Sequence, residues 1–300
     1  MKNSKISFPL LLGAFLALLL AGHAALTQQA QQTQQAPSSS SEYTPTVGQA
    51  GKDVIWVPTP DALVERMLQM AGVGPRDYVI DLGSGDGRTV IMAAEKFGAR
   101  ALGIEYNPEM VALSIRKAEE AGVSHKAKFI EADIFESDFS EATVITMYLL
   151  PRLNLKLRPI LLELRPGTRI VSHAFDMEDW EPEEKATVED RNAYFWIVPA
   201  KVAGNWDLEV PTDRGEETWT LTIEQEFQNL TGRVRFPDGS SDSVDGRVRG
   251  PEFRLDLISV DGSRREIEGR AFGNRLAGTL RDQGGKSRVW SAVPAGSPRT

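Results

Sequence analysis

The sequence predicts an α/β fold with a largely parallel sheet and helices on both faces, followed by a small antiparallel all-β domain. Between about residues 52 and 200, short apolar runs alternate with stretches in which apolar residues recur at helical spacing. That alternation is typical of strands joined by helices. After residue 200 the helical periodicity disappears, and short alternating runs separated by Gly, Asp and Ser replace it. We therefore expect one folded domain at 52–200 and a second at 201–300.

The composition excludes several kinds of site. A formal net charge of −8 argues against a general nucleic-acid binder, which needs a basic face, so no nucleic-acid partner is expected. The absence of cysteine excludes disulfides, thiolate metal sites and a cysteine nucleophile. With only three histidines, a histidine-rich metal site is not expected either, and we predict no bound metal.

Residues 1–25 have the pattern of a secretory signal peptide. Lys2 and Lys5 precede an apolar run at 8–20, and small residues follow it. The run is shorter than the roughly 20 apolar residues of a membrane span, and both a cleaved signal and an uncleaved N-terminal anchor remain open. Either one predicts an exported or membrane-anchored protein, with membrane contact only through this segment if it is uncleaved. Residues 26–51, rich in Gln, Ser, Ala and Thr, are predicted to be a disordered linker.

The predicted helices and strands of the first domain follow an apolar run at 54–57, which begins the folded part of the chain. Asp61 is expected to cap a first helix. Asn107 and Pro108 are expected to begin another helix, and a hairpin around 190–192 is expected to close the domain. The parallel strands are expected at 79–82, 101–104, 127–130, 143–147 and 168–173.

The three best-marked helices have apolar stripes that predict their buried faces. In the first, the stripe consists of Leu63, Val64, Met67, Leu68 and Met70. In the helix after Asn107, it consists of Met110, Val111, Leu113, Ile115 and Ala118. In the helix after strand 143–147, it consists of Leu153, Leu157, Ile160, Leu161 and Leu164.

A glycine-rich loop follows the strand at 79–82 and precedes a helical pattern. Its glycines Gly83, Gly85 and Gly87 permit positive φ and a close approach of the backbone to a ligand. The helix N-terminus adds unpaired N–H groups, which suit a nucleoside-bearing ligand with an acidic or polar tail. The spacing is G-x-G-x-G, whereas dinucleotide sites have G-x-G-x-x-G. Asp86 inside the loop would repel a pyrophosphate and favour a cationic ligand such as S-adenosylmethionine, which carries no phosphate.

A second acid stands about two dozen residues after Asp81. Glu105 ends the strand at 101–104, where a carboxylate can accept hydrogen bonds from both ribose hydroxyls of a nucleoside. The alternative is an exposed carboxylate at a strand end. Two features at compatible spacing favour the nucleoside site. Thr59, before the first helix, is placed to close over the ligand.

Four segments carry a resemblance to a known family. They are the loop at 81–88, the preceding Val-Pro-Thr-Pro at 57–60, Gly-Ile-Glu-Tyr-Asn-Pro at 103–108 and Tyr-Leu-Leu-Pro at 148–151. Residues 54–199 resemble the class I S-adenosylmethionine-dependent methyltransferases, in particular a bacterial subgroup related to mitochondrial-type protein lysine methyltransferases. The resemblance implies a Rossmann-like sheet, S-adenosylmethionine as cofactor and a protein lysine acceptor, although nothing else in the sequence selects lysine.

The resemblance also implies that an acid after the third strand receives the adenine amino group and that the next apolar residue flanks the ring. These positions are Asp133 and Ile134, and a cap of the following turn is the alternative for Asp133. The predicted cofactor contacts are Thr59, Asp81, Gly83, Ser84, Gly85, Asp86, Glu105, Tyr106, Asp133 and Ile134.

The methyl acceptor, a protein or a small molecule, is expected beyond the strand at 143–147, because ligands of such sheets lie outside the carboxyl ends of the strands. Tyr148 follows that strand and is the candidate catalytic-site residue. His173 ends the next strand, where a packed strand histidine is favoured over a catalytic base.

The C-terminal region has a weak internal echo, an apolar residue followed two positions later by glycine, at Gly232, Gly246, Gly269 and Gly278. Glycine in a strand marks a bend or a close approach, which predicts a meander or a small barrel. The triplet at 204–206 resembles the opening of lipocalin-like barrels. A structural appendage is favoured over an acceptor-binding module.

Three functions are compatible with these observations. An S-adenosylmethionine-dependent methyltransferase is favoured. The alternative is an exported, non-catalytic nucleoside- or small-ligand-binding protein whose β-barrel recognises the ligand. An NAD-dependent oxidoreductase is disfavoured by the glycine spacing and by Asp86. Export would separate the enzyme from its cytoplasmic cofactor supply, and the sequence does not remove this conflict.

Overall fold

The structure is a computed structural model that describes residues 43–213, 215–282 and 284–297. The predicted signal segment and most of the predicted linker lie outside these residues. Within them, no helix has the length and apolar character that crossing a membrane requires. The methyltransferase-like sheet and the all-β domain both lie in the compact unit formed by residues 45–300.

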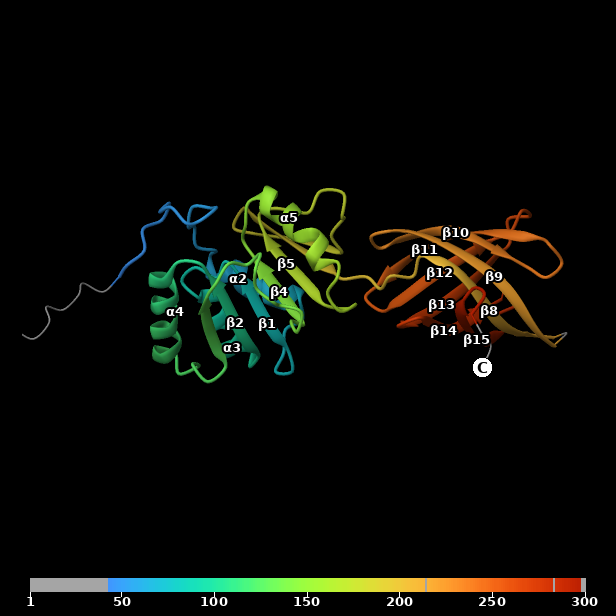
Figure 1. Ribbon diagram of the computed structural model, residues 1–300, viewed down its shortest axis with the longest axis horizontal. Helices are drawn as coiled ribbons and strands as arrows, with labels where there is room; N and C mark the ends of the chain where they lie inside the picture. Colours follow the sequence, from blue (N-terminus) through green and yellow to red (C-terminus); the bar gives the residue numbers. More distant parts are fainter. Residues whose placement is uncertain (1–42, 214, 283, 298–300) are drawn as a thin grey trace, which may run out of the picture. The chain divides into compact units, whose positions relative to one another are not determined.

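A seven-stranded sheet forms the first domain, in the order β3-β2-β1-β4-β5-β7-β6. Figure 1 labels β2, β1, β4 and β5 of this sheet. The first five strands are parallel, whereas β7 runs antiparallel to both β5 and β6. This arrangement confirms the predicted α/β class. The strands are β1 (Tyr78–Leu82), β2 (Arg100–Glu105), β3 (Ala127–Glu131), β4 (Val144–Met147), β5 (Arg169–His173), β6 (Glu184–Val188) and β7 (Arg191–Ile197).

Helices cover both faces of the sheet because successive residues of each strand point to opposite sides. The apolar residues of α2 (Asp61–Met70), α3 (Arg88–Phe97) and α4 (Pro108–Glu120) pack with one set of strand residues, such as Val79 and Val144. Those of α5 (Pro151–Leu161) pack with the alternate set, such as Ile80 and Ile145. Two cores result, one on each face.

Two of the three predicted helix stripes contain an error. Ile115 of α4 and Ile160 of α5 are about 40% exposed, not buried as predicted. The polar residues Ser114 of α4 and Asn154 of α5, in contrast, are both fully buried. The stripe of α2 is buried as predicted. Ser114 and Asn154 each bond to a loop that borders the pocket described below.

Among helices α2 to α5, only α4 begins with a side chain that caps the helix. The side chain of Asn107 accepts hydrogen bonds from the backbone N–H groups of Glu109 and Met110, which confirms the predicted start of α4. Asp61, however, is the first residue of α2 and does not cap it. Its carboxylate instead accepts a bond from Arg88, so a tertiary contact has replaced the local one.

Eight antiparallel strands form a closed barrel in the second domain, which confirms the predicted all-β domain. Apolar side chains such as Trp206, Phe253 and Trp290 fill its interior. The strands are β8 (Gly204–Thr212), β9 (Gly215–Glu226), β10 (Asn229–Arg235), β11 (Ser241–Arg249), β12 (Glu252–Ile258), β13 (Arg264–Phe272), β14 (Arg275–Arg281) and β15 (Ser287–Pro294).

Close approach between strands explains the glycine echo of the sequence. A Cβ atom at Gly232, Gly246 or Gly278 would lie 1.9–2.1 Å from a backbone oxygen of the neighbouring strand. At Gly269 it would lie 2.3 Å from the ring of Phe253. The barrel is therefore coiled so tightly that only glycine fits at these four positions.

We expect Gly278→Ala to destabilise the barrel by about 3 kcal/mol, because the added methyl group would overlap backbone atoms that cannot move aside. Gly284→Ala is the matched control, since its Cβ would meet a side-chain atom at an ordinary 3.4 Å. Thermal unfolding of the two variants provides the comparison. Equal melting temperatures would contradict this account of the barrel glycines.

Candidate functional site

A pocket of about 260 Å³ lies at the carboxyl ends of the parallel strands. The sheet order places β2 on one side of β1 and β4 on the other, so the connections after β1 and β4 diverge at this point. Such a switch in strand order opens a crevice that binds ligands in α/β sheets. The lining comes from residues 49–59 and from the segments that follow each of the five parallel strands. All the residues predicted to bind the cofactor, together with Tyr148, line it.

The glycine loop after β1 has the backbone that the sequence predicts. Gly83, Gly85 and Gly87 have φ values of 79°, 54° and 78°, a region that favours glycine. A Cβ at Gly87 would lie 2.8 Å from the Phe129 ring, and one at Gly85 would lie 2.6 Å from the indole nitrogen of Trp56. The loop is therefore fixed by packing on both sides. Ser114 adds a hydrogen bond of 3.0 Å to the carbonyl oxygen of Gly85.

Glu105 joins the glycine loop to the start of α4. Its two carboxylate oxygens accept hydrogen bonds of 2.9 Å from the backbone N–H groups of Gly85 and Asn107. Each carboxylate oxygen has a second lone pair, so these bonds orient the group and leave it able to accept more. Its position at the pocket wall fits the predicted contact with a ribose.

Asp81 is the buried acid of the site. Its side chain accepts a hydrogen bond of 2.6 Å from Thr146, its register partner on β4. Burial raises the pKa of Asp81 to about 7, against the opposing effect of the Thr146 bond and with a contribution from the charge of Glu105. No cationic side chain pairs with Asp81 in the described residues, so a cationic ligand in the pocket would stabilise its ionised form.

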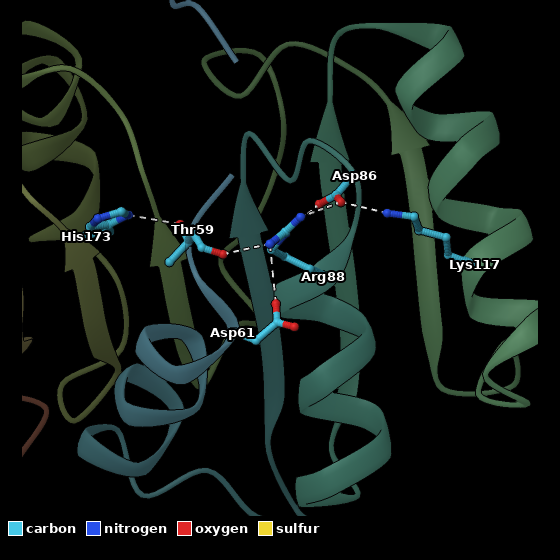
Figure 2. Close-up of polar contacts among 6 residues, drawn as sticks. All are labelled: Thr59, Asp61, Asp86, Arg88, Lys117 and His173. Carbon is cyan, nitrogen blue, oxygen red and sulfur yellow. Dashed lines mark hydrogen bonds and ion pairs between the residues drawn. The ribbon is translucent and has the colours of Figure 1, made fainter. Parts of the chain in front are cut away.

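Asp86 does not have the free carboxylate that the sequence analysis assumed. Arg88 donates two hydrogen bonds of 2.9 Å to it, and Lys117 donates one of 2.7 Å (Figure 2). Although burial acts to raise the pKa of Asp86, these bonds hold it below its usual value. The charge is neutralised within the protein, so the structure gives no support to a contact between this carboxylate and a cationic ligand.

Arg88 also fastens residues 59–61 to the glycine loop. Its guanidinium donates a bond of 2.9 Å to the carbonyl oxygen of Thr59 and one of 3.3 Å to Asp61 (Figure 2). The Thr59 hydroxyl, in turn, lies 2.9 Å from Nδ1 of His173 at the end of β5. One chain of contacts thus joins α4, the loop after β1, the segment before α2 and β5.

An aromatic group borders the other end of the pocket. The rings of Tyr148 and His173 have centroids 3.8 Å apart, and Phe175 stacks on Tyr148 at 6.4 Å. His173 is fully buried, and burial lowers its pKa to about 4, with a contribution from Arg191. A neutral histidine packed in this way fits the favoured structural role and not that of a base.

Asp133 has partners on both oxygens. The backbone N–H of Phe135 donates a hydrogen bond of 2.9 Å to one oxygen, as expected for a cap of the following turn. Lys52 forms an ion pair with the other oxygen. These bonds, that of Lys52 first, lower the pKa of Asp133. Lys52 also lies 4.5 Å from the centre of the Tyr106 ring. Both predicted roles of Asp133 thus remain compatible with the geometry, but an adenine amino group would have to compete with Lys52.

The residues present fit an adenosine-bearing sulfonium cofactor. The hydroxyl of Ser84 has no hydrogen-bond partner, but it is enclosed by protein and packs on Gly103 of β2, so the structure gives no support to a ligand contact through this hydroxyl. Asp81 and Glu105 supply carboxylates, and Ile134 and Met110 supply apolar contacts. In the described residues, no group of three or more His, Asp or Glu side chains is arranged to hold a metal ion.

Sequence reasoning missed the residues whose contribution depends on distant parts of the chain. Lys52, Trp56, Arg88 and Lys117 come from three segments of the chain, and each contacts a residue of another segment. The only local indication was the Arg88 side chain two residues after Asp86, a spacing that permits a salt bridge.

Comparisons with known proteins agree with this geometry. A family model described as the ANTKMT methyltransferase domain matches residues 81–184. A protein-lysine N-methyltransferase of Saccharolobus islandicus (strain REY15A) is 47% identical over 151 residues, which make up 48% of this chain and 94% of that protein.

Two other similar proteins differ from this relative, one in the share of its length that is matched and the other in being described as an RNA methyltransferase. An adenine nucleotide translocase lysine N-methyltransferase of Mus musculus is 35% identical over 121 residues, 40% of this chain and 52% of that protein. The chain thus spans about half the length of this relative. The solved structure of an RNA methyltransferase from Salinibacter ruber with S-adenosyl-L-homocysteine has 51% identity, covers 49% of this chain and 96% of that one, and gives a TM-score of 0.48.

Asp81→Asn should stabilise the protein at alkaline pH. Burial raises the pKa of Asp81 from 3.8 to about 7, so the folded state holds a proton that the unfolded state has lost between these values. The wild type therefore loses stability as the pH rises through this window. The variant should melt above the wild type at pH 8 and nearly equal to it at pH 4. A wild type that gains stability relative to the variant as the pH rises would contradict this.

Proposed function

The chain belongs to the class I S-adenosylmethionine-dependent methyltransferases, and on that premise we propose that it transfers the methyl group to a lysine side chain of a protein. The observation that carries the proposal is the 47% identity to the Saccharolobus islandicus protein-lysine N-methyltransferase, which the chain matches over 94% of its length. The proposal extends that protein's described activity to residues 52–200 of this chain.

The character of the acceptor end of the pocket supports a lysine. Tyr148 and Phe175 supply aromatic faces, and Leu150 supplies an apolar edge that is 41% exposed. A lysine has an apolar stem and a cationic head, so its stem packs on apolar side chains and its head is attracted to aromatic faces. The carboxylates of the lining lie in or after β1, β2 and β3 or, in the case of Asp53, in residues 49–59, and none of them follows β4 or β5.

S-adenosylmethionine supplies, when bound, an electrophilic methyl group on a sulfonium. Glu105 would hold its nucleoside and the glycine loop its amino-acid part, and the buried Asp81 would offset its positive charge. The ring of Tyr148 would orient the incoming amine. Alignment and exclusion of water are the main contributions a protein makes to such a displacement.

The lysine must lose a proton before its nitrogen can form the new bond to carbon. His173 is a poor base for this step because its pKa is about 4 and its Nδ1 lies 2.9 Å from the Thr59 hydroxyl. Neither Tyr148 nor Leu150 is fully buried, so we propose that the proton leaves to solvent at this end of the pocket. The aromatic wall formed by Tyr148 and Phe175 thus selects the acceptor lysine and takes no part in removing the proton of the lysine.

Glu105→Ala should weaken binding of S-adenosylmethionine at least about tenfold, since hydrogen bonds to a charged group contribute about 1.5–3 kcal/mol each. Isothermal titration calorimetry measures the dissociation constant. Glu109→Ala is the matched control, because Glu109 is an exposed acid four residues away that does not line the pocket. Equal affinity of the two variants would contradict the proposed ribose contact.

Tyr148 should act through its ring. We expect Tyr148→Phe to keep kcat/KM for a lysine peptide within about threefold of the wild type, and Tyr148→Ala to lower it about tenfold or more. The dissociation constant of S-adenosylmethionine should change little in both. A loss of activity in Tyr148→Phe as large as that in Tyr148→Ala would assign the role to the hydroxyl instead.

Transfer of labelled methyl groups to a lysine peptide, a small amine and a mixed RNA sample tests the acceptor class directly. Lysine methylation of the peptide, located by mass spectrometry, is the expected result. Transfer to RNA alone would overturn the lysine proposal, and binding of the cofactor without any transfer would favour the non-catalytic alternative. Export of the protein is a separate proposal, and immunoblotting of cell fractions tests it.

A further inference from the structure

The loop at 174–183, between β5 and β6, carries one wall of the proposed acceptor site. Phe175 lines the pocket and stacks on Tyr148. Two residues of this loop, Ala174 and Glu178, have φ values of 67° and 55°. Such values are unfavourable for residues other than glycine, so surrounding contacts must hold the loop in this form.

Helix α5 holds the first half of the loop. The buried amide of Asn154 donates bonds of 3.2 Å to the carbonyl oxygens of Phe175 and Asp176. Arg158 donates a bond of 2.9 Å to the carbonyl oxygen of Met177 and forms an ion pair with Asp179. These contacts hold the backbone of Phe175 and of the next two residues of the loop against α5.

The second half of the loop is held by the barrel. The turn between β9 and β10 consists of Phe227 and Gln228. The Phe227 ring stacks on Trp180 with centroids 6.1 Å apart and an angle of 13° between the rings. Gln228 is 1% exposed and donates a bond of 3.0 Å to the carbonyl oxygen of Glu181.

Two further contacts join the same parts. The guanidinium of Arg158, which bonds the first half of the loop, lies 5.4 Å from the centre of the Phe227 ring. Glu183, at the end of the loop, lies 3.7 Å from Arg247 and 3.6 Å from Arg249 of β11. The barrel thus contacts the loop through aromatic stacking, a partly buried hydrogen bond and ion pairs.

Phe227 itself has a φ of 51°, which is costly for a bulky residue at a turn where glycine would fit. A two-residue hairpin turn with glycine here would form without this cost. The contacts made by the ring offset the strain. Phenylalanine at this position is therefore explained by its contacts with the loop at 174–183 and not by the backbone conformation of the turn.

We propose that Phe227 and Gln228 are positioning residues of the methyl-acceptor site, and that through them the barrel holds the loop that presents Phe175. This inference rests on the proposed function, and it assigns a role to the C-terminal domain. Through these contacts the barrel touches neither the glycine loop nor Glu105. It therefore affects the binding and orientation of the methyl acceptor and leaves the affinity for the cofactor unchanged.

Phe227→Gly in the full chain is the decisive variant, because glycine accepts the turn's φ and only the ring is lost. Phe227→Tyr keeps the ring and should restore wild-type behaviour. Phe272→Ala is the matched control, since Phe272 is a 56% exposed aromatic residue at another turn of the barrel. Hydrogen exchange, calorimetry with S-adenosylmethionine and steady-state kinetics with a lysine peptide are measured for each.

In Phe227→Gly, backbone amides at 175–183 should exchange faster while those of the glycine loop do not change. The acceptor kcat/KM should fall about tenfold, because misplacement of a site by about 1 Å can cost as much as a hundredfold. Cofactor affinity should stay equal to that of the wild type. Exchange and kinetics equal to those of Phe272→Ala would overturn the proposal. A wild type without methyl transfer would contradict the proposed function, and hydrogen exchange would still decide this inference.

Discussion

The site depends on the reversal of strand order at β1. The chain adds β2 and β3 on one side of this strand and then crosses to add β4 and β5 on the other. The loops that follow β1 and β4 therefore diverge, and a crevice opens between them. Glu105 stabilises this crevice because it bonds the backbones of both the glycine loop and the start of α4. The pocket is thus formed by topology and then fixed by one carboxylate.

Two acids of the same loop region have opposite electrostatic environments. Asp86 is paired with Arg88 and Lys117, which hold its pKa low, whereas burial without a cationic partner raises the pKa of Asp81 to about 7. Asp86 therefore has a structural role, since its partner Arg88 also bonds the segment before α2. Asp81 is left as the acid that gains most from a positively charged ligand.

Much of the fold could be predicted because periodicity and turn chemistry are local. The strands of the sheet and the Asn107 cap follow from neighbouring residues, and the barrel glycines are marked by their repeat along the sequence. Predictions failed where a distant partner decided the outcome. Ile115 and Ile160 are partly exposed, whereas the polar Ser114 and Asn154 of the same helices are buried and bond to loops next to the pocket.

The same limit applies to the site. Glycine spacing and the strand-end position of Glu105 located the pocket, because both are set by the order of residues along the chain. The pairing of Lys52 with Asp133 joins residues 81 positions apart, and no pattern in either segment indicates the other. The contacts between the loop at 174–183 and the turn at 227–228 are equally remote in sequence.

A crystal structure of the full chain with S-adenosylhomocysteine tests the central claim most directly. The account predicts the ribose hydroxyls at Glu105, the amino-acid part against the glycine loop, and the sulfur directed to the pocket wall that Tyr148 and Phe175 form. Lys52 would be displaced from Asp133 if adenine takes its place there. A nucleoside bound away from Glu105, or a sulfur directed away from the aromatic wall, would contradict the account.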